Sequence, residues 1–131
     1  MKTFPVGGVH PSDNKQWSNA KAIEVLELPD GVKLPMVQHI GAPATPVVQK
    51  GDKVLTGQIV GQSAGFVSAN IHSPISGTVV NVDMFPNGQG QRRMMVVIKR
   101  EGDEWLETID RTPDHKRECT LEPKEIIAKI K

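Results

Sequence analysis

Short apolar runs separated by turn residues fill the stretch from Val47 to Val82, and they constrain the fold more than any other part of the chain. The pairs Gly51-Asp52 and Gly57-Gln58 each precede strand-forming residues. The segment Ser73–Val79 then returns the chain through proline, serine and glycine. Closely spaced turns between short β-branched runs are typical of a small all-β domain.

Strands are predicted wherever such a run is bounded by turn residues. Within the core we expect them at Val47-Val48, Val54-Leu55, Ile59-Val60, Phe66-Val67, Thr78–Val82, Met94–Ile98 and Trp105–Ile109. Asn87-Gly88 predicts a turn between the two long strands. Ahead of the core, the alternating segment Ile23–Leu28 predicts one more strand, and the prolines up to Pro46 predict an extended chain.

The layout of the central stretch resembles a lipoyl- or biotinyl-type carrier domain. Such domains hold their cofactor on one lysine of an exposed hairpin between the two halves. Here the corresponding hairpin is Ser63–Asn70, and no lysine occurs between Lys53 and Lys99. The sequence therefore predicts the scaffold of a carrier domain without the amine that would be modified.

Charge divides the chain into parts of different character. Residues 99–131 hold 17 charged side chains, whereas residues 54–91 hold only Asp83. We expect an N-terminal arm with edge strands over residues 1–46, a β-core over 47–110 and a charged linker over 111–131. The linker ends in a short helix that begins near Pro123. Because so short a helix needs something to pack against, we expect a fragment of something longer.

Composition excludes several classes of function. The net charge is +1 and the aromatic residues are three Phe and two Trp, so nothing predicts a surface that binds nucleic acid. The only cysteine is Cys119, which excludes an internal disulfide and an iron–sulfur cluster held by this chain alone. No apolar run approaches the ~20 residues of a membrane span.

No catalytic constellation is evident in the sequence. The four histidines lack a metal-ligand spacing, no serine lies in a GxSxG elbow, and the glycines form no phosphate-binding loop. We therefore predict no catalytic, cofactor-binding or metal-binding residue, and we expect that this chain alone is not an enzyme.

Five motifs, taken together and in order, resemble one known family. They are Gly7–Pro11 with Asn14-Lys15, Gln38–Ala44, Gly51–Val54, Gly57-Gln58 and Ile71–Gly77. They are similar to the N-terminal region of RnfC, the C subunit of the Rnf electron-transport complex, which is an ion-motive ferredoxin–NAD oxidoreductase of bacterial membranes. The resemblance runs from Phe4 to Lys131. The A subunit of the sodium-pumping NADH–quinone reductase and a cobalamin reductase have similar N-terminal regions, so these branches stay open.

The resemblance implies an all-β fold whose core is a barrel-sandwich hybrid, with an extended N-terminal arm and a short C-terminal helix. In the full-length family, an iron–sulfur protein family, FMN, NADH and two 4Fe-4S clusters bind further along the polypeptide. The resemblance implies that residues 111–131 lead into a nucleotide-binding domain that is missing from this sequence. None of the family's redox residues maps onto this sequence. The implied role is a non-catalytic structural domain. Two other classes stay open: a carrier with an unusual attachment site, and a stand-alone lipoyl-like binding module.

The implied partners are the flavin/NADH domain of the same polypeptide and the other Rnf subunits. The implied location is the cytoplasmic face of the bacterial inner membrane, as a peripheral domain that meets the membrane only indirectly and is soluble as a fragment.

Three loops rich in glycine and proline are candidates for these contacts, since such backbone can approach a partner closely. They are His10–Lys15, Gln38–Ala44 and Ile71–Gly77. The candidate interface residues are His10, Pro11, Asn14, Lys15, Gln38, His39, Gly41, Ala42, His72, Ser73 and Pro74. The other interpretation is that the same residues only shape turns.

Overall fold

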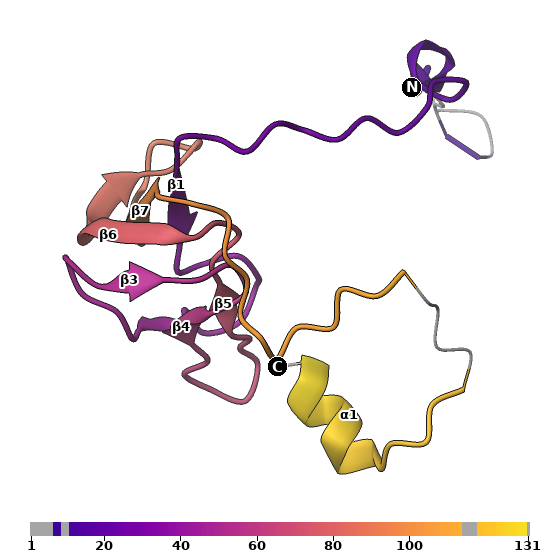
Figure 1. The fold of residues 1–131 in the computed structure, drawn as a ribbon. Helices are drawn as coiled ribbons and strands as arrows, with labels where there is room; N and C mark the ends of the chain where they lie inside the picture. The colour runs from indigo at the N-terminus through magenta and orange to yellow at the C-terminus, as the bar shows by residue number, and fades with distance from the viewer. Residues whose placement is uncertain (1–6, 9–10, 114–117, 131) are drawn as a thin grey trace.

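Two antiparallel β-sheets face each other and enclose the core, as the computed structural model shows for residues 7–8, 11–113 and 118–130 (Figure 1). One sheet has four strands in the order β1-β7-β6-β3, and the other has three in the order β2-β4-β5. The strands are β1 (Gly31–Pro35), β2 (Thr45–Pro46), β3 (Lys53–Val54), β4 (Ile59–Gln62), β5 (Ile71–His72), β6 (Gly77–Pro86) and β7 (Arg92–Arg100). A 3-10 turn, Lys15–Trp17, and a helix, α1 (Pro123–Ile130), lie outside the sheets. This confirms the predicted all-β class with an N-terminal arm and a short C-terminal helix.

The two long strands form the backbone of the larger sheet. β6 and β7 pair from Gly77↔Arg100 to Pro86↔Arg92, with a bulge between Val79 and Asn81. The predicted turn at Asn87 connects them, and its carboxamide oxygen accepts from the amide N–H of Gln91 at 2.9 Å. A bulge bends a strand and increases its twist, which helps this sheet to curve over the smaller one.

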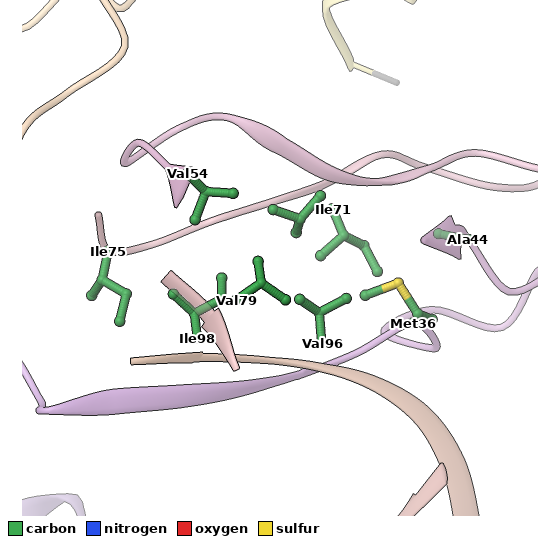
Figure 2. Close-up of a cluster of buried hydrophobic side chains, with 9 residues drawn as sticks. Met36, Ala44, Val54, Ile71, Ile75, Val79, Val96 and Ile98 are labelled. Carbon is green, nitrogen blue, oxygen red and sulfur yellow. The ribbon is translucent and has the colours of Figure 1, made fainter. Parts of the chain in front are cut away.

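Nine side chains fill the space between the sheets, and eight of them are labelled in Figure 2. They are Met36, Ala44, Val54, Val60, Ile71, Ile75, Val79, Val96 and Ile98. Both sheets and the loops that follow β1 and β5 contribute to the cluster. Its members are β-branched with two exceptions, which suits close packing on pleated strands.

Turn chemistry places the short strands as expected. Gly51 adopts φ 98° and donates its N–H to the Val79 carbonyl at 2.7 Å, so β3 begins beside β6. Gly57 adopts φ 87° and donates to the Ser73 carbonyl at 2.7 Å, directly before β4. Both conformations lie in the left-handed region that favours glycine.

Four predicted strands are wrong or displaced. Ile23–Leu28 is an extended coil, because no neighbouring strand lies beside it within the described residues. Phe66-Val67 lies in the bend of a loop, and Trp105–Ile109 makes only an isolated bridge between Thr56 and Trp105. Val47-Val48 follows β2 rather than forming it. Conversely, β1 forms without a separate local signal and pairs with β7 along its whole length.

Candidate functional site

The site under consideration is the hairpin loop between β4 and β5, where a carrier domain would hold its lysine. It covers residues 63–70 and packs against residues 38–44, which follow β1. We call these two segments the paired loops. Neither contains a lysine, so neither offers the amine to which lipoyl or biotinyl groups are attached.

Backbone and serine groups join the two segments. The amide of Ala42 donates to the Val67 carbonyl at 2.8 Å, and the Ser68 hydroxyl donates to the Ala42 carbonyl at 2.9 Å. The same hydroxyl accepts from the amide of Ala64 at 3.1 Å. Because Ser68 is buried, these bonds are shielded from water and fix the loop conformation.

Gly41 allows the paired loops to come this close. A Cβ atom added there would overlap the carbonyl oxygen of Val67 and crowd its side chain. The glycine is therefore required by close approach of two backbones, and not by a positive φ.

His39 connects both loops through its imidazole ring. The amide of Gly41 donates to Nδ1 at 3.1 Å, and the amide of Ala69 donates to Nε2 at 3.1 Å. A neutral imidazole has only one unprotonated nitrogen, so only one of these amides has an acceptor at a time. The ring thus acts as an acceptor shared between the two loops.

Three large apolar side chains project from this fixed framework into solvent. Ile40, Phe66 and Val67 have exposed fractions of 106%, 95% and 63%. A pocket of about 380 Å³ beside them is lined by His39, Phe66, Val67, Ser68, Ala69 and two residues of α1, Ile127 and Ile130. On the other side of His39, a more polar pocket of about 480 Å³ reaches the β6–β7 turn.

The structure separates the three predicted contact loops. Gln38, His39, Gly41 and Ala42 all belong to the paired loops. Pro11, Asn14 and Lys15 are exposed on the N-terminal arm, where the ammonium of Lys15 pairs with the Asp13 carboxylate at 3.3 Å, and His10 lies outside the described residues.

The third predicted loop is largely internal. Ser73 is buried, and its hydroxyl donates to the Ile75 carbonyl at 2.5 Å. His72 and Pro74 are exposed at the end of β5. Of the three candidates in this loop, only these two face solvent, so the loop has a structural part as well as any contact role.

Phe66 and Val67 were missed as candidate site residues. An aromatic residue beside valine favours a strand, and this pattern led to the prediction of one. Their neighbours indicate a loop instead, because small and polar loop residues flank them on both sides: Ser63-Ala64-Gly65 and Ser68-Ala69-Asn70.

The described residues contain no group of three or more His, Cys, Asp or Glu side chains that could hold a metal ion. Among them there is also no helix long and apolar enough to cross a membrane.

Comparisons with known proteins connect this geometry to a family. A model of the RnfC barrel-sandwich hybrid domain matches residues 2–103. The chain is 47% identical over 110 residues to the C subunit of the proton-translocating ferredoxin:NAD(+) oxidoreductase complex of Clostridium ljungdahlii, and the match covers 83% of this chain and 24% of the relative. It is 44% identical over 116 residues to the Na(+)-translocating counterpart of Acetobacterium woodii, where the match covers 88% of this chain and 25% of the relative.

A third relative is the C subunit of the ion-translocating oxidoreductase complex of Rhodobacter capsulatus. It is 37% identical over 134 residues, and the match covers 99% of this chain and 25% of the relative. The chain thus spans about a quarter of the length of these curated relatives. The matched domain also confirms the predicted barrel-sandwich hybrid class.

Proposed function

This chain belongs to the RnfC family, whose barrel-sandwich hybrid domain it matches. On that basis we propose that it is the non-catalytic N-terminal docking domain of an RnfC subunit, in an ion-translocating ferredoxin:NAD oxidoreductase complex. The names of the relatives support the complex, and the matched region supports the domain. The inventory of side chains supports the non-catalytic role, since no nucleophile, base or phosphate loop is assembled at the paired loops.

The redox groups belong, in this proposal, to the rest of a longer polypeptide. FMN, NADH and two 4Fe-4S clusters would bind there, and the domain described here would position that part against the other subunits. The relatives, about four times as long as the matched region, leave room for such domains. We place the domain at the cytoplasmic face of the membrane, as a peripheral part of the complex.

The observation that carries the proposal is a rigid, lysine-free loop pair that holds Ile40, Phe66 and Val67 in water. Exposed large apolar side chains on a fixed frame are unfavourable in an isolated protein, and in complexes they are typical anchors of a partner. Because the loops are held by hydrogen bonds before any partner arrives, little conformational entropy is lost on docking. Gln38, His39, Gly41 and Ala42 hold the frame, and the three apolar side chains make the contact.

The partner at this site is, in our proposal, the flavin/NADH domain of the same polypeptide. The α1 helix follows the core in sequence and already lines the 380 Å³ pocket with Ile127 and Ile130. We propose that His72, Pro74 and the arm residues His10, Pro11, Asn14 and Lys15 contact the same polypeptide or neighbouring subunits.

A substitution at the centre of the apolar group tests the proposal. In the full-length protein, Phe66→Asp is expected to reduce NADH oxidation and co-purification with the other subunits by at least about tenfold. The flavin/NADH domain of the same polypeptide loses an aromatic anchor that contributes ~2 kcal/mol or more, so it is no longer held in position against those subunits. Val47→Asp is the matched control, since Val47 is 50% exposed and belongs to neither of the paired loops. Full assembly and activity of the Phe66→Asp complex would contradict docking through this site.

The double variant Gln38→Ala with His39→Ala tests the residues that hold the paired loops together, without changing Phe66. It is expected to weaken assembly while leaving the core folded, as followed by circular dichroism. An intact mass equal to the sequence mass, after expression in cells with active lipoyl and biotinyl ligases, separates the docking domain from a carrier domain.

A further inference from the structure

The N-terminal arm contains an exposed apolar segment, Ile23–Leu28, that pairs with no strand among the described residues. Ile23, Val25 and Leu26 are 99%, 95% and 87% exposed, in a chain that runs away from the sheets (Figure 1). From Ala22 to Leu28, no residue makes a hydrogen bond to another described residue. Unpaired backbone combined with exposed, β-favouring side chains is the state of a strand that lacks its neighbour.

The larger sheet has a free edge that could receive such a strand. β1 is the outermost strand, so its far side has no neighbour within the described residues. Asp30 and Met36 bond to β7, through Arg100 N–H to the Asp30 carbonyl and Met36 N–H to the Met94 carbonyl, both at 2.9 Å. Since backbone groups alternate in direction along a strand, those of Gly31 and Lys33 turn to the free edge.

The arm cannot reach this edge in its own molecule in the observed conformation. Arg100 holds the carbonyls of both linking residues: its backbone N–H bonds to Asp30 and its Nε to Pro29 at 3.1 Å. These bonds keep the chain straight as it enters β1, where a hairpin would need a reversal at Pro29-Asp30. An arm that leaves in this direction is free to pair with the edge of another molecule.

We propose that two copies of this chain exchange arms, so that residues 22–28 of each pair antiparallel with β1 of the other. The exchanged segment and β1 have similar lengths: Ile23–Leu28 has six residues and Gly31–Pro35 has five. The resulting dimer is isologous, because each copy gives its arm and receives its partner's.

One register satisfies charge and apolar contacts together. When Glu24 of one copy lies opposite Lys33 of the other, Leu26 lies opposite Gly31, on the outer face of the sheet. That face has a groove of about 460 Å³ beside β1, lined in part by Val80 and Val97, and Gly31 has no side chain to fill it.

On the inner face, the same register places Ile23 beside Leu34 and Val25 beside Val32. Leu34 and Val32 pack against the core and are only half-buried, so an added strand extends the core at its open margin. Opposite charges and apolar pairs on directly opposed residues stabilise antiparallel strands.

The mass of the 131-residue chain in solution tests the proposal first. Sedimentation equilibrium or light scattering at micromolar concentrations is expected to give twice 14.3 kDa. A monomer up to the highest soluble concentration overturns the exchange.

Charge reversal then tests the register. Glu24→Lys and Lys33→Glu are each expected to raise the dimer dissociation constant about tenfold or more, since each appears twice in the symmetric dimer. The Glu24→Lys/Lys33→Glu double variant should restore it. Lys53→Glu, the same change on the opposite edge strand β3, is the matched control and should have no effect.

The proposed pairing is overturned if neither single reversal raises the dissociation constant. It is also overturned if the double variant does not restore the wild-type value. Leu26→Pro offers a further test that should not destabilise the domain, because Leu26 lies outside the core. The proline removes the N–H that would donate to Gly31 of the other copy, and the variant should be a folded monomer. Docking through Phe66 is unaffected by all these changes, so failure here leaves the proposed function untouched.

Discussion

At the scale of single residues, His39 determines how firmly the paired loops are joined. We expect His39→Ala to raise amide hydrogen exchange about tenfold at the amide, Gly41 or Ala69, that donates to the unprotonated nitrogen of the predominant tautomer, because that amide loses its acceptor. His39→Asn should preserve protection of Gly41 alone, since its carboxamide oxygen takes the place of Nδ1. Exchange measured by NMR distinguishes the two. Equal protection in the wild type and His39→Ala would mean that the imidazole does not hold the loops.

The sequence identified His39 as a contact residue for a reason that the structure changes. Its place among glycine and proline indicated a functional loop, whereas its partner Ala69 lies 30 positions away and no local pattern connects them. Gly41 is similar, because the crowding by Val67 that requires a glycine exists only after folding. The loop positions of both residues were thus predictable from their glycine and proline neighbours, and their long-range partners were not.

At the scale of elements, the segment 104–109 closes one end of the sandwich as a strap. The amide of Thr56 donates to the Glu104 carbonyl at 3.0 Å, and the amide of Leu106 donates to the Thr56 carbonyl at 3.0 Å. The amide of Glu104 donates to the hydroxyl of buried Ser76 at 3.0 Å. Ile109 fills the space over Gly57, where a Cβ would overlap it.

Removing the strap is expected to destabilise the fold although the family match ends at residue 103. We expect a chain that ends at Asp103 to lose about 2–4 kcal/mol of unfolding free energy relative to one that ends at Pro113, because buried partners of Thr56 and Ser76 disappear. Urea unfolding measures the difference. Ile109→Ala should reproduce part of it, and the exposed Ile127→Ala should not. Equal midpoints for the two truncated chains would show that the strap is dispensable.

Elements were predictable where a local signal and a tertiary partner agree. β6 and β7 have long β-branched runs, a turn at Asn87-Gly88 and each other as neighbours, so they were predicted in large part. Ile23–Leu28 has the same local signal without a neighbour, and it remains coil. β1 shows the opposite combination: its local signal is weak, because it contains a lysine and a proline, but it pairs with β7 along its whole length. Pairing, not propensity, decided both cases.

At the scale of the whole molecule, the predicted division into residues 1–46, 47–110 and 111–131 stays a prediction that truncation can test. Core side chains are distributed across the first boundary: Met36 and Ala44 are 1% and 4% exposed, and they pack with Val60 and Ile71 of the smaller sheet. In contrast, no described residue before Val32 or after Ile98 belongs to the core cluster or packs against it. The smallest independent folding unit should therefore begin at Asp30 and include the strap.

We expect a chain of residues 30–113 to unfold cooperatively at a temperature within a few degrees of the whole chain, and a chain of residues 47–113 to be unfolded. The 47–113 chain loses β1, which covers the open side of β7. It also loses Met36, and removing this one core side chain should lower the free energy of unfolding by about 2–5 kcal/mol, a large part of the stability of a small domain. The reference for both is the Leu26→Pro chain, so that association through the arm does not enter the comparison. Scanning calorimetry decides the question. A folded 47–113 chain would place the core boundary at residue 47, and a destabilised 30–113 chain would give the arm or residues 114–131 a structural role within the same molecule.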